Sequence, residues 1–86
     1  MPTISMFLGL LIQMYFDEHN PPHIHVRYQS DKATFNIHSG DMKEGSLSKR
    51  NIRLVQAWIE LHRDELLANW ELCRNDEQPY KIDPLK

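Results

Sequence analysis

The chain has 86 residues, a formal net charge of −2 and a hydrophobic fraction of 41%. This length predicts a single domain over residues 1–86, whose small core would gain stability from a partner or from a homo-oligomer. The charge excludes a generally basic nucleic-acid coat, and the single Cys73 excludes an internal disulfide, which fits a reducing cytoplasm.

The opening segment, through Phe16, predicts strands rather than a targeting signal. It lacks the basic start and the small-residue cleavage site of a signal peptide, and its apolar run is too short to span a bilayer. We therefore expect a cytoplasmic protein without a membrane partner. The β-branched and aromatic residues favour strands over 3–8 and 10–16, joined by either a hairpin or a bulge at Gly9.

Two runs of alternating polar and apolar residues follow a loop that Pro21 and Pro22 stiffen. The polar face of residues 23–29 carries His23, His25 and Arg27, and that of residues 32–38 carries Lys32, Thr34, Asn36 and His38. The alternation predicts a β-hairpin with apolar residues inward and polar residues outward. A two-residue turn at Ser30-Asp31 would place His23 opposite His38. Residues 42–45 are a candidate short edge strand.

The segment from Ser48 to Asn75 contains neither glycine nor proline, and its apolar residues recur with helical period. Ser46 or Ser48 can cap its start. A continuous helix of this length would measure about 40 Å, whereas a compact domain of this size is about 30 Å across. We therefore expect a bend near His62 or an end that projects to a partner. The tail, 76–86, is expected to be loose unless Ile82 packs back on the sheet.

The histidines suit two chemistries. As general acid and base they would act on RNA without a metal, because the ribose hydroxyl is the nucleophile, while Arg27 and Lys32 hold a phosphate. The candidate catalytic residues are His19, His23, His25, Arg27 and His38. Alternatively, His19, His23 and His25 would bind zinc, copper or nickel, with Asp17 and Glu18 near but not clearly placed as ligands. A solvated sheet face that merely tolerates histidines is the ordinary alternative.

A second group of candidates lies at the start of the predicted helix. Lys49, Arg50 and Arg53 oppose the helix dipole, and a phosphate or carboxylate ligand would reconcile them with it. Ordinary pairing with Asp41, Glu44 or Glu60 explains the same charges. His62 and Cys73 fall in the apolar stripe and are expected in the core. Trp70 also fits the core, or anchors a partner if the helix end projects.

Five segments together resemble the small bacterial proteins of the domain-of-unknown-function 4160 family. They are MPTISMF, HNPPHIHV, KATFNI, GSLSKR and LHRDELLANWEL, and they extend over nearly the whole chain. Members of this family are often encoded beside another small protein, an arrangement similar to a toxin–antitoxin pair. The resemblance therefore implies a cognate small protein as partner. The matching positions include His19, His23, His25 and Arg27, together with Lys49 and Arg50. Ser48 stands where the family pattern has proline, which alters only the helix cap.

These observations predict an α+β fold in which a small, mainly antiparallel sheet of about four strands packs on a long or bent C-terminal helix. The functional hypothesis is a toxin-like protein that acts on RNA through the His/Arg face, with no resident cofactor. The alternatives are a non-catalytic binding or regulatory module of such a pair and a metal-binding protein.

Overall fold

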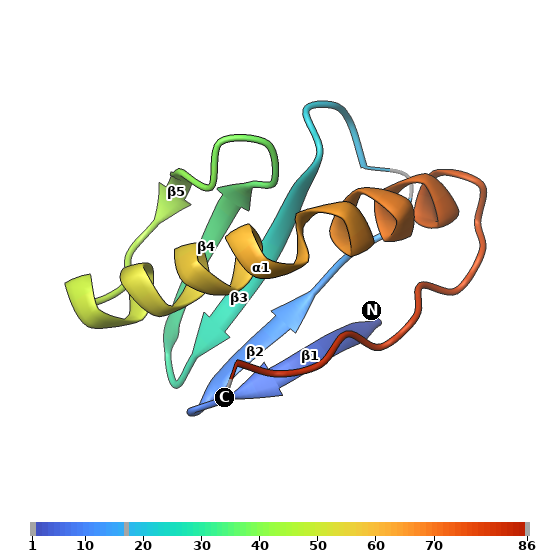
Figure 1. Ribbon diagram of the computed structural model, residues 1–86. Helices are drawn as coiled ribbons and strands as arrows, with labels where there is room; N and C mark the ends of the chain where they lie inside the picture. The colour runs from blue at the N-terminus through green and yellow to red at the C-terminus, as the bar shows by residue number, and fades with distance from the viewer. Residues whose placement is uncertain (1, 17, 86) are drawn as a thin grey trace.

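The computed structural model describes residues 2–16 and 18–85, which form one sheet and one long helix. The strands are β1 (Thr3–Phe7), β2 (Leu10–Gln13), β3 (His23–Tyr28), β4 (Asp31–Asn36) and β5 (Met42–Gly45), and the helix is α1 (Lys49–Arg74). The strands pair antiparallel in chain order, and α1 crosses one face of the sheet (Figure 1). The predicted α+β class is confirmed. The sheet has five strands rather than about four, because 42–45 does form an edge strand.

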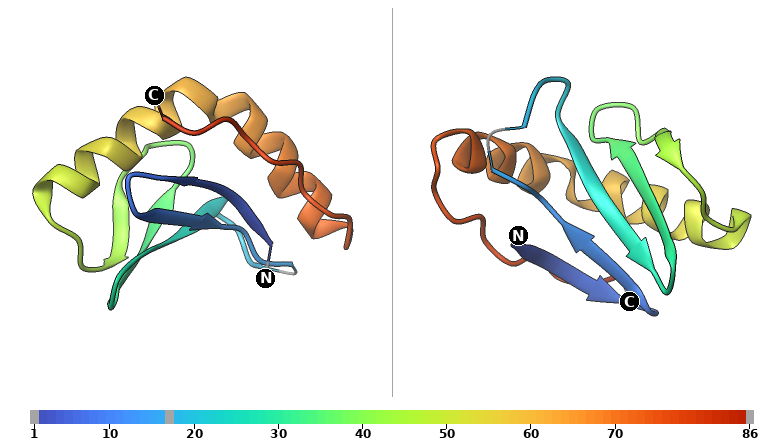
Figure 2. Two further views of the ribbon diagram at one scale, coloured as in Figure 1. Left: turned by 90° about the horizontal axis from the view of Figure 1, so that it is seen from below. Right: turned by 180° about the vertical axis from the view of Figure 1, so that it is seen from behind.

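The core lies between the sheet and α1, which arches over it (Figure 2). In β3 and β4 the residues buried in this layer alternate along the strands, as predicted: Ile24 and Val26 in β3, and Ala33 and Phe35 in β4. The fully buried side chains of greatest volume are Trp58, Trp70, Phe35, Ile4, Leu10, Ile12, Met14, Ile24, Ile37, Ile59, Leu66 and Val26. Among residues 2–16 and 18–85, no helix combines the length and the apolar character needed to cross a bilayer.

The first two strands form a tight hairpin, which decides between the two alternatives at Gly9. Phe7 pairs with Leu10, so Leu8 and Gly9 are the two turn residues. Both have positive φ angles, 50° and 82°, which is the backbone of a type I′ turn and matches the twist of the flanking strands.

The β3–β4 hairpin forms with the predicted faces but in a different register. His23 pairs with Asn36 and His25 with Thr34, so the turn lies at Gln29-Ser30 and not at Ser30-Asp31. The shift is two residues, and an alternating pattern cannot distinguish registers two residues apart because both place the same side chains on each face. The expected placement of His38 opposite His23 is therefore wrong, and His38 is exposed in the turn after β4.

The helix is bent where the length argument predicted. Ser48 caps its start, with its Oγ accepting a hydrogen bond from the Asn51 amide at 3.1 Å. His62 has non-helical angles, φ −124° and ψ 21°, and Arg63 Nε donates to the Ile37 carbonyl at 3.0 Å. The bend wraps the second half of α1 around the sheet, so Trp70 is buried and does not project to a partner.

The tail is tied to the domain and is not loose. The Ile82 amide donates to the Ile4 carbonyl at 2.8 Å, and Trp58 Nε1 donates to the Asp83 carbonyl at 2.8 Å. The buried Asn69 side chain donates to the Tyr80 carbonyl at 2.8 Å and accepts from the Tyr80 amide at 3.0 Å. The tail thus runs back beside β1 (Figure 1), held by backbone groups that a sequence pattern does not reveal.

We predict that Asn69→Ala destabilises the protein by about 1–3 kcal/mol, because it removes both side-chain bonds that hold Tyr80. Urea unfolding measures the loss, and amide exchange should become faster at residues 80–83. Asn75→Ala is the matched control, since the exposed Asn75 side chain bonds only the Glu71 carbonyl, and should cost no more than about 0.5 kcal/mol. Equal losses in the two variants would contradict the assigned role of Asn69.

Candidate functional site

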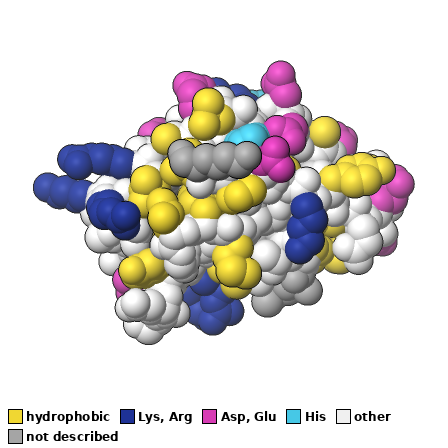
Figure 3. All heavy atoms as spheres, turned by 60° about the horizontal axis from the view of Figure 1, so that its bottom comes forward, with side chains coloured by type: hydrophobic (Ala, Val, Ile, Leu, Met, Phe, Trp, Pro, Cys, Tyr) yellow, Lys and Arg dark blue, Asp and Glu magenta, His cyan; other side chains and the backbone are white. Residues whose placement is uncertain are grey.

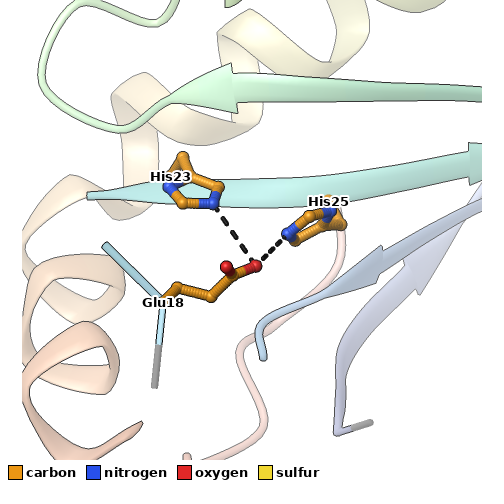
Figure 4. A group of neighbouring side chains, drawn as sticks. All are labelled: Glu18, His23 and His25. Carbon is orange, nitrogen blue, oxygen red and sulfur yellow. Dashed lines mark hydrogen bonds and ion pairs between the residues drawn. The ribbon is translucent and has the colours of Figure 1, made fainter. Parts of the chain in front are cut away.

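The candidate site is formed by two histidines of β3 and one glutamate of the preceding loop. Because Ile24 and Val26 point into the core, alternation turns His23 and His25 to the outer face of the sheet. The loop that ends in Pro21 and Pro22 returns the Glu18 carboxylate to this face, where it lies between the two rings (Figure 4).

The Glu18 carboxylate contacts both imidazoles through one oxygen. Its Oε1 lies 2.6 Å from His25 Nε2 and 3.5 Å from His23 Nε2. The side chains of Glu18, His23 and His25 retain 27%, 17% and 22% of their exposure, so the cluster is partly buried but open to small molecules from solvent.

The hydrogen bonds assign a proton position to each ring. His23 Nδ1 lies 2.9 Å from the Pro21 carbonyl, which can only accept, so this nitrogen carries the hydrogen. In neutral His23 the Nε2 atom is therefore a bare lone pair directed at the cluster. The short contact of His25 Nε2 with a carboxylate instead places a hydrogen on that nitrogen. In the neutral rings, this geometry favours a hydrogen on Nε2 of His25 and none on Nε2 of His23.

Aromatic packing holds both rings in place. The His25 ring stacks on Tyr15 with centroids 3.9 Å apart and planes 8° apart. The His23 ring contacts His25 edge-on at 5.2 Å, and it also contacts Trp70, at 5.2 Å, from the second half of α1. The helix bend therefore reaches the site, because it brings Trp70 to the start of β3.

Two adjacent hollows on the outer face meet at His25. The first is lined by Glu18, His19, Asn20, Pro21, His23, His25, Thr34, Lys43 and Glu44. The second is lined by Tyr15, His25, Val26, Arg27, Lys32, Ala33, Thr34, Glu44 and Gly45. In the second, Arg27 and Lys32 are direct cross-strand partners, and among the described residues neither forms an ion pair. Like charges in this position repel one another unless an anion lies between them.

The structure brings together some of the predicted site residues and separates others. The His23 and His25 rings are in contact, and Arg27 lies on the same face of β3, two residues beyond His25. His19 lines the first hollow but is not one of the three converging groups. His38 lies two residues beyond Asn36, which is the cross-strand partner of His23. Asp17 lies outside the described residues.

Glu18 and Tyr15 are the functional candidates that sequence reasoning did not place. Glu18 is in an irregular loop, and Tyr15 lies beyond the end of β2, because the strand predicted over 10–16 ends at Gln13. One sequence feature points to Glu18. It is an acidic residue shortly before Pro21 and Pro22, and these prolines stiffen the chain ahead of the strand that carries His23 and His25.

The predicted anion site at the start of α1 is separate from this cluster. Lys49, Arg50 and Arg53 are exposed, and Figure 3 shows Lys and Arg side chains grouped at the left, the end at which α1 begins in Figure 1. Among the described residues, no ion pair joins them to Asp41, Glu44 or Glu60. Anion binding by these cations stays a prediction.

Much of the GSLSKR segment has a structural explanation. Gly45 has φ 96°, and a Cβ there would lie 2.1 Å from the Lys32 carbonyl oxygen, so only glycine lets β5 approach β4 this closely. Leu47 is in the core and Ser48 is the helix cap. Gly45, Leu47 and Ser48 therefore build the fold, whereas Lys49 and Arg50 keep the predicted anion-binding role.

Comparison with known proteins identifies a family without assigned chemistry. A family model described as a domain of unknown function (DUF4160) matches residues 9–71. The matched span includes Glu18, His23 and His25 and extends through Trp70. No curated protein and no solved structure gives a significant match.

The proton positions give a direct spectroscopic prediction. For the neutral form of each ring, long-range ¹H–¹⁵N spectra should show His23 as the Nδ1–H tautomer and His25 as the Nε2–H tautomer. Exposed His38 serves as the control and should show the averaged shifts of an unconstrained ring. A His23 ring protonated on Nε2 would contradict the assignment.

Proposed function

The chain belongs to the DUF4160 family, and we propose that it is the toxin-like member of a bacterial two-gene pair that acts on RNA at Glu18, His23 and His25. The observation that supports this best is the convergence of two imidazoles and a carboxylate on one open face, with His23 Nδ1 bonded to the Pro21 carbonyl and His25 Nε2 bonded to Glu18. Such a pair has the parts of a general base and a general acid, and both are needed to cleave a phosphodiester.

In the proposed reaction the substrate supplies its own nucleophile. His23 Nε2 removes the proton of a ribose 2′-hydroxyl, and the 2′-oxygen forms a bond to the adjacent phosphorus. The bond from phosphorus to the 5′-oxygen breaks, and His25, in its imidazolium form with both ring nitrogens protonated, donates the Nε2 proton to that leaving oxygen and becomes neutral. The products are a 2′,3′-cyclic phosphate and a free 5′-hydroxyl. Proton exchange with water returns His23 to its neutral form and His25 to the imidazolium, whose positive charge the Glu18 carboxylate beside Nε2 would stabilise.

Arg27 and Lys32 would hold the phosphate of this substrate. They face each other across β3 and β4, and they line the hollow that begins at His25. A bound phosphate relieves their mutual repulsion and gains charge-assisted hydrogen bonds from the guanidinium. Such binding would be local, which is compatible with a chain whose net charge is −2.

The proposed partner is the small protein encoded beside family members, acting in the cytoplasm to neutralise this chain. A second candidate function is a non-catalytic module that binds this partner or a nucleic acid without cleaving RNA. The observation that favours it is the exposed Lys49, Arg50 and Arg53 group, which lies apart from the histidine cluster. The two functions differ in which residues they need.

We predict that the wild-type chain, expressed alone in bacteria, arrests growth and that co-expression of the neighbouring protein restores it. His23→Ala and His25→Ala should each relieve the arrest, because they remove the proposed base and acid. His38→Ala is the matched control and should stay toxic, since His38 lies in the turn after β4. Growth curves and sequencing of cyclic-phosphate RNA ends provide the measurements.

Two outcomes would count against this proposal. If the wild-type chain neither slows growth nor produces cyclic-phosphate ends, the RNA-acting function is wrong. If histidine variants remain as active as wild type while Arg50→Ala/Arg53→Ala loses activity, the binding module replaces it.

For substrate binding, we predict that Arg27→Ala weakens the affinity for a 2′-O-methyl RNA oligonucleotide about tenfold and lowers the salt dependence by about one phosphate contact. The 2′-O-methyl group blocks the nucleophile, so fluorescence anisotropy measures binding alone. Arg53→Ala, at the start of α1, is the control and should bind as wild type does. Equal loss in both variants would argue against a phosphate site at Arg27.

A further inference from the structure

The same three groups that suit acid–base chemistry also form a set of metal ligands. One ligand atom from each of Glu18, His23 and His25 lies within 4.8 Å of the other two. The donors are two imidazole nitrogens and one carboxylate oxygen, drawn from a strand and a loop, so a single ion would join two separate parts of the chain.

The two distances from the Glu18 oxygen to the histidine nitrogens need little adjustment for a tetrahedral ion. Ligand bonds of about 2.0–2.1 Å place neighbouring ligand atoms about 3.3 Å apart. Glu18 Oε1 already lies 3.5 Å from His23 Nε2, and its 2.6 Å contact with His25 Nε2 would have to lengthen by less than about 1 Å. A rotation of the Glu18 side chain, which belongs to a loop, supplies such a movement.

The surroundings orient both rings for ligation. The His23 Nδ1–H bond to the Pro21 carbonyl directs a bare Nε2 to the cluster, and a carbonyl behind a ligating histidine is a recurrent arrangement at metal sites. Stacking on Tyr15 fixes the His25 ring. All three side chains keep some exposure, which leaves one side of an ion accessible to water.

The donor set selects among metals. Imidazole nitrogen suits zinc, copper, iron and nickel, whereas magnesium and calcium favour oxygen ligands, so two nitrogens with one oxygen argue against the latter pair. Two histidines and a glutamate with an open fourth position is a familiar zinc arrangement. Because its d shell is filled, Zn²⁺ has no electronic preference for one coordination geometry. This suits a site whose ligands must move by a fraction of an ångström.

We propose that Glu18, His23 and His25 bind one Zn²⁺ ion, and that the zinc-bound chain is the silent form of the site. The second half of this inference rests on the proposed function. Zinc would occupy the lone pair of His23 that takes the substrate proton, and it would displace the proton that His25 donates. One ion therefore removes the base and the acid together.

The test of binding uses untagged, chelator-treated full-length protein and Zn²⁺ alone, because an affinity tag would itself bind the ion. Competition with a chromophoric zinc chelator should show one equivalent per chain. Glu18→Gln, His23→Gln and His25→Gln should each weaken binding at least about tenfold. His38→Gln and His19→Gln should bind as wild type does, because neither ring belongs to the converging set. Unchanged binding in the first three variants, or loss in a control, overturns the site.

A second measurement on the wild-type chain avoids the risk that a variant fails to fold. On addition of Zn²⁺, the Nε2 resonances of His23 and His25 should shift together while those of His38 and His62 stay in place. A shift confined to His19 or His38 would overturn the assignment.

Activity then separates the two proposals. RNA cleavage should be present in the chelator-treated protein and lost on addition of one equivalent of Zn²⁺. If cleavage requires zinc, the proposal that the zinc-bound chain is inactive is wrong, whereas the proposed metal site is still supported. Zinc binding as predicted, with no cleavage in either form, would refute the RNA-acting function and not the metal site.

Discussion

The structure depends on the alternation of side chains along β3, the middle strand of the sheet. A strand with neighbours on both edges cannot rotate without losing two ladders of hydrogen bonds, and burial of Ile24 and Val26 fixes which face is inward. His23, His25 and Arg27 are therefore held outward by the same contacts that build the core. The backbone of the two site histidines therefore belongs to the centre of the fold, whereas Glu18 comes from the loop before β3.

The bent helix links core packing to the site. A straight helix of this length would leave the compact body, whereas the break at His62 turns its second half around the sheet and buries Trp70. Trp70 then supports the His23 ring, and Asn69 beside it holds the returning tail. Trp70 thus supports the candidate site and Asn69 holds the tail. The bend at His62 therefore affects both regions.

The chemistry of the cluster is governed by the Glu18 carboxylate. Without it, two histidines on a sheet face would be ordinary solvated side chains. With it, a carboxylate oxygen lies within reach of both rings, while the Pro21 carbonyl orients His23. Both proposals start from this geometry: proton transfer would use the ring nitrogens with a proton, and metal binding would use the same nitrogens with a cation. Under these proposals the two states exclude each other, so occupancy by an ion would control the acid–base site.

The sequence by itself determined the elements and the faces. Period-two alternation defined which residues of β3 and β4 point inward, and the helical stripe defined α1. The length of that stripe predicted either a bend near His62 or a projecting end, and the structure has the bend. Only the tertiary structure decided the register, because registers two residues apart preserve the faces, and this removed His38 from the candidate site. Only the tertiary structure brought Glu18 and Tyr15 to the histidines and tied the tail to Asn69, because loops and backbone contacts leave no periodic signal. The resulting site keeps His23 and His25 from the sequence prediction and gains the carboxylate that defines their chemistry.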